Sequence, residues 1–213
     1  MTGYKIKIPD ADNKFVSELR VKLSLTSLPI LLDTIPGADD EVRACFINVD
    51  KRVKSEGGET VFGWQFWEHP YMIQAEFHAV WRKPDGSLVD ITPKDDDHIR
   101  RILFVEDPVR KFDGIQTDNL RINTTGNELI DDLIEVERAK YRFMNKDGRD
   151  KVIGVVHLEN DDARLWQSLN NLSAILAASH LAGGNIISPC FCRSGRSYIN
   201  CHREFVQKGM LEI

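Results

Sequence analysis

A short stretch near the C-terminus holds three of the four cysteines in the chain. Cys190 and Cys192 form a C-x-C pair, and Cys201 and His202 form a second pair after eight intervening residues. Three thiolates and one imidazole make a complete tetrahedral ligand set for zinc. Gly195 lies between the pairs and can adopt the positive φ that a tight turn requires. The spacing therefore predicts a Zn²⁺ site that folds this end of the chain. The alternative is three ordinary cysteines beside a surface histidine.

This stretch resembles the SEC-C motif, a small zinc-binding tail of the bacterial export motor ATPase that also ends many unrelated proteins. The residues that carry the resemblance are Pro189, Cys190, Cys192, Ser194, Gly195, Tyr198, Cys201 and His202. The family usually has Gly directly after the second cysteine, where this chain has Arg193, and it is richer in Lys and Arg between the ligand pairs. The resemblance implies zinc coordination by the four ligands, and it gives less support for a conserved partner-binding surface.

Length and charge exclude several classes of protein. A chain of 213 residues is long enough for one sizeable core with an appendage. The net charge is −5 and no basic stripe exists, so we do not expect duplex nucleic acid as a partner. No apolar signal core opens the chain, and no segment is long enough to span a bilayer. Clustered thiols without a signal peptide predict a cytoplasmic protein.

The apolar pattern predicts helices at residues 13–33, at about 39–55, at 127–143 and at 160–181. In the second of these, Asp39 and Asp40 are the expected caps. Its expected buried stripe is Val42, Phe46, Val49 and Val53.

Strands are predicted at residues 4–8, 60–67, 72–82, 87–92 and 152–157, with 94–126 as an irregular excursion. Together these elements predict an α+β domain over residues 1–182. A zinc-binding tail over residues 186–213 follows a Gly-rich linker.

A second group of residues, Cys45, His78 and Asp90, supplies in this order a thiol, an imidazole and a carboxylate, the groups that nucleophilic catalysis by a cysteine uses. The start of a helix stabilises a thiolate at Cys45 through unpaired N–H groups and the helix dipole. His78 and Asp90 lie on strands joined by Pro84-Asp85-Gly86, which is typical of a three-residue hairpin loop. This loop pairs Lys83 with Ser87, so His78 and Asp90 point to the same face as diagonal neighbours.

The segment from Cys45 to Pro93 resembles the core of transglutaminase-like and other papain-like cysteine enzymes. The matching features are a cysteine at a helix start, His-Ala-Val-Trp on a strand, and Val-Asp-Ile-Thr-Pro on the next. The resemblance implies a helix packed on an antiparallel sheet, with Cys45 as nucleophile, His78 as general base and acid, and Asp90 as orienting group. The Gly or Trp neighbours common in active members are absent around Cys45. Candidate oxyanion donors are Gln65, Trp64 Nε1–H and the Cys45 backbone N–H.

These patterns favour a cysteine hydrolase or acyltransferase acting on an amide bond, with a protein or peptide as substrate or partner. A protease, a deamidase and a transglutaminase-like enzyme all fit this description. The competing hypothesis is a non-catalytic adaptor in which Cys45 and His78 are core residues. In that case the zinc tail recruits a protein partner.

Overall fold

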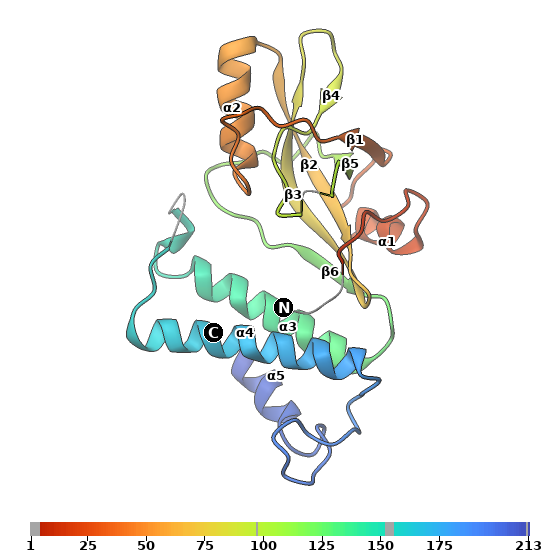
Figure 1. Ribbon diagram of the computed structural model, residues 1–213, viewed down its shortest axis with the longest axis vertical. Helices are drawn as coiled ribbons and strands as arrows, with labels where there is room; N and C mark the ends of the chain where they lie inside the picture. The colour runs from red at the N-terminus through yellow and green to blue at the C-terminus, as the bar shows by residue number, and fades with distance from the viewer. Residues whose placement is uncertain (1–4, 97, 152–155, 212) are drawn as a thin grey trace. The chain divides into compact units, whose positions relative to one another are not determined.

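The computed structural model describes residues 5–96, 98–151, 156–211 and 213. The chain forms two compact units, which Figure 1 colours by residue number. We call Lys5–Asp113 with Asn119–Ile122 the sheet unit, and Gly114–Asp118 with Asn123–Ile213 the helical unit. The predicted division between residues 182 and 186 falls inside the helical unit. The strand predicted at 152–157 lies largely outside the described residues.

The sheet unit is built on a six-stranded sheet with the order β1-β5-β2-β3-β4, in which β6 also pairs with β3. All four neighbouring pairs along the β1-to-β4 path are antiparallel. The strands are β1 (Ile30–Asp33), β2 (Glu59–Glu68), β3 (Met72–Arg82), β4 (Leu88–Val89), β5 (Arg101–Glu106) and β6 (Leu120–Asn123). An α+β fold is therefore confirmed.

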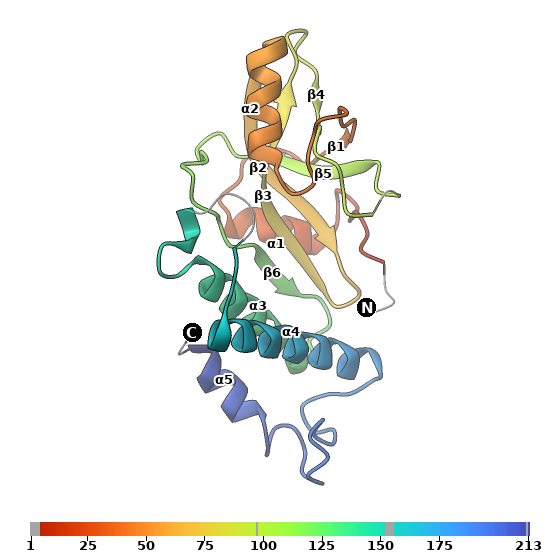
Figure 2. The same cartoon turned by 60° about the vertical axis from the view of Figure 1, so that its left-hand side comes forward.

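Two helices belong to the sheet unit, α1 (Lys14–Lys22) and α2 (Cys45–Glu56). Helix α2 lies along one face of the sheet beside β2 and β3 (Figure 2). Its residues Phe46, Val49 and Val53 pack with Ala79 and other side chains of the sheet. The expected stripe is thus correct for these three residues.

The start predicted for this helix is wrong. Helix α2 begins at Cys45, and Val42 lies outside it with 44 % of its surface exposed. Asp40 does not cap the helix. Its carboxylate accepts hydrogen bonds from Gly37 N (2.6 Å) and from Arg52 Nη2 (2.9 Å), so it fixes the preceding loop against the helix side.

Two further predictions for this unit are corrected. Residues 13–33 are helical only to Lys22, because Ser24 adopts a left-handed conformation (φ of 56°) that ends the helix, and Ile30–Asp33 joins the sheet as β1. The stretch 94–126 is not irregular throughout, since it contains β5 and β6. Strand β5 lies between β1 and β2, and the run Ile102–Val105 is buried on both faces of the sheet. Such a strand shows no polar alternation.

The helical unit contains α3 (Glu128–Asn145), a 3₁₀ turn (Arg149–Lys151), α4 (Asn160–Leu181) and α5 (Arg203–Leu211). Helix α3 packs against α4 and α5 (Figure 1). Asn127 caps α3, because its side chain accepts a hydrogen bond from Leu129 N (3.1 Å). Asn160 is the first residue of α4, and Glu159 occupies its cap position.

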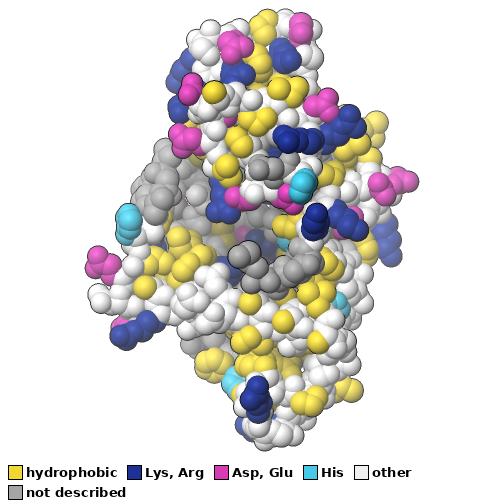
Figure 3. All heavy atoms as spheres, in the orientation of Figure 1, with side chains coloured by type: hydrophobic (Ala, Val, Ile, Leu, Met, Phe, Trp, Pro, Cys, Tyr) yellow, Lys and Arg dark blue, Asp and Glu magenta, His cyan; other side chains and the backbone are white. Residues whose placement is uncertain are grey.

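No helix in the described ranges combines the length and hydropathy that crossing a bilayer requires. On the face drawn in Figure 3, basic and acidic side chains are interspersed over the sheet unit.

Candidate active site and candidate metal centre

The β3–β4 hairpin has the register predicted from its loop. Arg82 pairs with Leu88, and Lys83 N donates to Ser87 O at 2.9 Å. In this register the side chains of His78 and Asp90 meet. His78 Nε2 and Asp90 Oδ1 lie 2.9 Å apart, and both side chains are buried. The predicted contact between these two residues is confirmed.

Four groups surround the Asp90 carboxylate. Oδ1 receives the His78 ring and the backbone N–H of Thr92 (3.1 Å). Oδ2 accepts from Thr34 Oγ1 (2.9 Å) and binds Lys94 Nζ (2.7 Å). Asp90 directly follows β4, and its backbone pairs beside β1: its N–H donates to Asp33 O (3.1 Å) and its C=O accepts from Ile35 N (2.8 Å). The carboxylate is therefore held by side chains next to both outer strands of the β1-to-β4 order, Thr34 after β1 and Lys94 after β4.

The charges in this group shift two pKa values. Burial raises the pKa of Asp90, but the charges and hydrogen bonds of His78 and Lys94 outweigh it, so this pKa lies below its ordinary value. For His78, burial lowers the pKa, and so does the charge of Lys94. The negative charges of Cys45 and Asp90 oppose them and raise the pKa of His78 to about 9.

Cys45 is the first residue of α2, so its backbone N–H lies among the helix-start donors that have no intrahelical acceptor. The side chain is 8 % exposed and packs with Val49, Ala79 and Ile91. Its sulfur makes no hydrogen bond among the residues that the structure describes. Cys45 nevertheless lies close enough for the charge of its thiolate to raise the pKa of His78. Electrostatic proximity thus joins the thiol to the hydrogen-bonded pair.

The loop before Cys45 is strained. Arg43 adopts a left-handed backbone conformation with φ of 62°, which favours glycine. Its guanidinium forms an exposed ion pair with Asp95 at 3.0 Å. This pair connects the loop before α2 with the loop that carries Lys94. The chain thus has Arg, in a conformation better suited to Gly, close to the nucleophile candidate.

Three residues around the site were not identified from the sequence: Thr34, Lys94 and Asn48. Asn48 is buried on α2 and exchanges hydrogen bonds with both backbone groups of Glu41 (3.1 and 2.8 Å). The spacing of Lys94 from Asp90, four residues along the chain, is the one local signal that could have found it. Thr34 gave no signal, because it lies far from Asp90 in sequence.

Two candidate oxyanion donors have other partners. Gln65 Nε2 donates to Glu76 Oε2 at 2.9 Å, and Trp64 Nε1 donates to Asp107 Oδ2 at 3.1 Å. Of the three candidates, the Cys45 backbone N–H therefore stays as a prediction.

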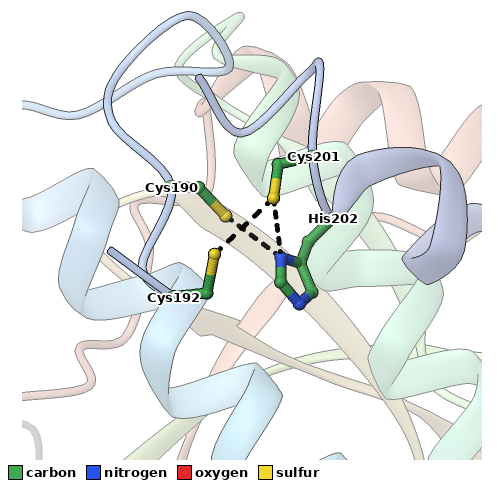
Figure 4. Close-up of side chains that lie close together, drawn as sticks. All are labelled: Cys190, Cys192, Cys201 and His202. Carbon is green, nitrogen blue, oxygen red and sulfur yellow. Dashed lines mark hydrogen bonds between the residues drawn. The ribbon is translucent and has the colours of Figure 1, made fainter. Parts of the chain in front are cut away.

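The four C-terminal ligand candidates lie together (Figure 4). Their ligand atoms are all within 4.8 Å of one another. Cys190 Sγ lies 3.2 Å from His202 Nδ1, and Cys192 Sγ lies 3.6 Å from Cys201 Sγ. A tetrahedral zinc ion with Zn–S bonds of about 2.3 Å separates its ligand atoms by roughly 3.8 Å. The cluster can hold a metal ion of this size with little movement.

The backbone of the tail forms two tight turns around these ligands. Cys190 N donates to Arg196 O at 2.8 Å, and the bridge Pro189–Ser197 closes the first loop. Gly195 has the positive φ that we predicted, at 81°. Arg193 also has a positive φ, at 60°, at the position where the SEC-C family usually has Gly. The departure from the family pattern thus falls where the backbone favours glycine.

The tail is fixed to α3 by ion pairs next to the cluster. Arg203 follows His202 and binds Asp132 at 3.0 Å and Glu128 at 2.7 Å. Gln207 Nε2 also donates to Asp132, at 3.0 Å. Asp132 is buried on α3, so it accepts from two residues of α5 and holds that helix in place.

Comparisons with family models, with curated proteins and with solved structures found no significant match. The two resemblances therefore stay expectations from the sequence. The structure itself establishes an α+β fold with an antiparallel sheet, and a Cys₃His cluster that could hold a metal.

Proposed function

We propose that the chain is a cysteine-nucleophile hydrolase or acyltransferase that acts on an amide bond. Cys45 is the nucleophile, His78 the general base and acid, and Asp90 the group that orients His78. The observation that carries this proposal is the buried His78–Asp90 hydrogen bond beside a cysteine that starts a helix. The sheet that holds them, with α2 against its face, agrees with the papain/transglutaminase-like core that the sequence suggested.

Acylation begins when the Cys45 thiolate attacks the amide carbonyl, forming a carbon–sulfur bond and an oxyanion. The Cys45 N–H is placed at the helix start, where donors and the helix dipole stabilise such an oxyanion. Protonated His78 then gives its proton to the amide nitrogen as the carbon–nitrogen bond breaks. The products of this step are a free amine, a thioester on Cys45 and a neutral His78.

Deacylation follows from the charges around His78. The Cys45 thiolate raises the pKa of His78, but a thioester carries no charge and removes that effect. Burial and Lys94 then lower the pKa of the ring, so neutral His78 can accept a proton from water or from a second amine. The attack breaks the carbon–sulfur bond, releases the acyl group as an acid or a new amide, and leaves Cys45 as a thiolate beside a protonated His78. Asp90 keeps the ring in one orientation throughout.

We also propose that Cys190, Cys192, Cys201 and His202 bind Zn²⁺. Four protein ligands leave no open coordination position, so the metal would stabilise the fold of the tail and would not activate water. Ser194 supports this assignment, because its hydroxyl lies 3.4 Å from Cys201 Sγ and its hydrogen bonds lower the pKa of Cys192 to about 6. The thiolate form is thus favoured at Cys192, whereas burial raises the pKa of Cys190.

One observation favours the adaptor as a second candidate. The side chains of Cys45, His78 and Asp90 are only 8, 2 and 0 % exposed, which suits a structural ion cluster as well as a closed active site. The tail, in contrast, exposes Ile187 and Phe205, each 71 % accessible. A protein that works through its tail would leave Cys45 unreactive in the folded state.

Thiol alkylation separates the two candidates. Iodoacetamide should modify Cys45 of the folded protein at about pH 7, because a thiolate beside a protonated histidine reacts well below the range of a free thiol. Peptide mass spectrometry distinguishes Cys45 from the three tail cysteines. His78→Ala should abolish the reaction at this pH, and His98→Ala, which changes an exposed histidine, should not. Labelling only after unfolding would support the adaptor.

A further inference from the structure

Lys94 is a buried cation that the proposed reaction does not use directly. Its side chain is 7 % exposed, and Nζ lies 2.7 Å from Asp90 Oδ2. The same ammonium donates to Gln65 Oε1 at 3.2 Å and lies 5.9 Å from the centre of the Trp67 ring. A lysine is rarely buried unless it is paired. The charged partner of Lys94, and its shortest contact, is therefore the carboxylate that holds His78.

We propose that Lys94 is a positioning residue of this site, whose ammonium neutralises Asp90 and leaves Oδ1 of that carboxylate to orient the His78 ring. This inference rests on the proposed function. Lys94 and Thr34 occupy Oδ2, while His78 and Thr92 N occupy Oδ1. Without the ammonium, Oδ2 loses its charged partner and keeps only the hydroxyl of Thr34, so the carboxylate is held less firmly.

Charge balance gives Lys94 a second consequence for the reaction. The thiolate, the imidazolium, the carboxylate and the ammonium sum to zero in a buried volume. Without Lys94 the same group carries one net negative charge, which favours the protonated ring at every step. His78 would then release its proton to the leaving amine less readily. Lys94 thus lets Asp90 orient the ring without fixing it as an imidazolium.

Few other charged groups act on His78. The groups that shift its titration are Cys45 from α2, and Asp90 and Lys94 from the segment after β4. Strand β2 places Gly63 opposite His78 and contributes the neutral Gln65, which bonds both Lys94 and Glu76. Glu76, on β3, is the next carboxylate and accepts hydrogen bonds from Gln65 and Trp67.

The test is an NMR titration of the His78 ring in the full-length protein, assigned by the signal lost in His78→Ala. We expect a midpoint at about pH 9 in the unmodified chain. Lys94→Met should raise the proton affinity of His78 roughly tenfold, because a positive charge that opposes protonation is lost. Lys94→Arg should restore a midpoint close to the original. Lys140→Met, which removes a lysine paired with Glu137 in the helical unit, is the matched control.

An unchanged or lower midpoint in a folded Lys94→Met protein would overturn the role of Lys94. If that variant does not fold, Lys94→Gln keeps a hydrogen-bond donor without the charge and should give the same upward shift. A merely structural lysine would lower stability without moving the titration. The proposed function has a separate readout, since Cys45→Ala should lower the His78 midpoint. An equal midpoint in Cys45→Ala and the original chain would reject the function and leave the Lys94 result intact.

Discussion

Thr34 Oγ1 donates a hydrogen bond of 2.9 Å to Asp90 Oδ2, and both side chains are buried. The two residues are 56 positions apart in the sequence, so this contact exists only in the folded chain. It joins the end of β1 to the carboxylate that orients His78. The stability of the sheet unit and the geometry of the candidate site therefore depend on the same hydrogen bond.

Thr34→Val should lower the free energy of unfolding by about 1–3 kcal/mol, because it removes one donor from a buried carboxylate and keeps the side-chain shape. Urea unfolding measures the change. Thr125→Val is the control, since the Thr125 hydroxyl also donates a hydrogen bond but is exposed. Equally small changes in the free energy of unfolding for the two substitutions would show that the Thr34–Asp90 hydrogen bond does not stabilise the fold.

The raised pKa of His78 predicts a fall in stability at alkaline pH. The folded protein binds a proton on His78 up to about pH 9, whereas the unfolded chain releases it near 6.5. The stabilisation is therefore complete below about pH 6.5 and is lost as the pH rises through 9, for a total of about 3 kcal/mol. The pKa of Asp90 is lowered, so its contribution is also stabilising but has the opposite pH dependence, and it is lost as the pH falls.

Unfolding free energies measured between pH 6 and 10 test this prediction. The slope in the original chain should be steeper than in His78→Gln, which has no titrating ring. His98→Gln, at an exposed position, should keep the original slope. The prediction fails if His78→Gln and the original chain lose stability in parallel, because the alkaline loss then has another source.

The local parts of this site could be predicted from the sequence, and the long-range parts could not. The His78–Asp90 contact follows from a three-residue loop and strand alternation, both of which act over a few residues. The contributions of Thr34 and Lys94 depend on how β1 and the segment after β4 come together. Strand β5 was missed for a related reason: burial on both faces removes the polar alternation that identifies a strand.

The same contrast applies to the tail. Ligand spacing predicted the Cys₃His cluster, because the four residues lie close along the chain. The attachment of α5 to α3 through Asp132 joins residues 71 positions apart, and no sequence pattern indicated it.

Arg193→Gly should strengthen metal binding by the tail. Arg193 has a φ of 60°, a conformation that costs a non-glycine residue about 1–2 kcal/mol. Glycine removes that cost but has more freedom in the unfolded chain, so a net gain of roughly 0.5–1 kcal/mol is expected. Competition with a chromogenic chelator measures the affinity. Arg196→Gly is the matched control, and it should weaken binding because Arg196 is not left-handed. Gains of equal size in both variants would point to a charge effect.

Metal removal should disorder the tail and leave the sheet unit folded. Most of the folding free energy of so short a segment comes from its metal and from its docking. Hydrogen exchange after chelation should therefore increase within residues 186–211, while amides of β2 and β3 keep their protection. A loss of protection in both units together would show that the tail is integral to the whole chain.

Asp132→Asn should uncouple the tail from α3. The carboxylate is buried and binds Arg203 and Gln207, so the substitution leaves Arg203 with Glu128 as its remaining charged partner. Loss of one partner of a buried ion pair costs about 3–5 kcal/mol when the other charge has no partner. Glu128 is half exposed and retains part of the interaction, so we expect the free energy of unfolding to fall by about 2 kcal/mol.

Because α5 directly follows His202, the affinity of the tail for its metal should fall together with stability in Asp132→Asn. Asp131→Asn changes the exposed neighbour and should leave both unchanged. A stability loss with full metal affinity would show that the cluster folds without its support on α3.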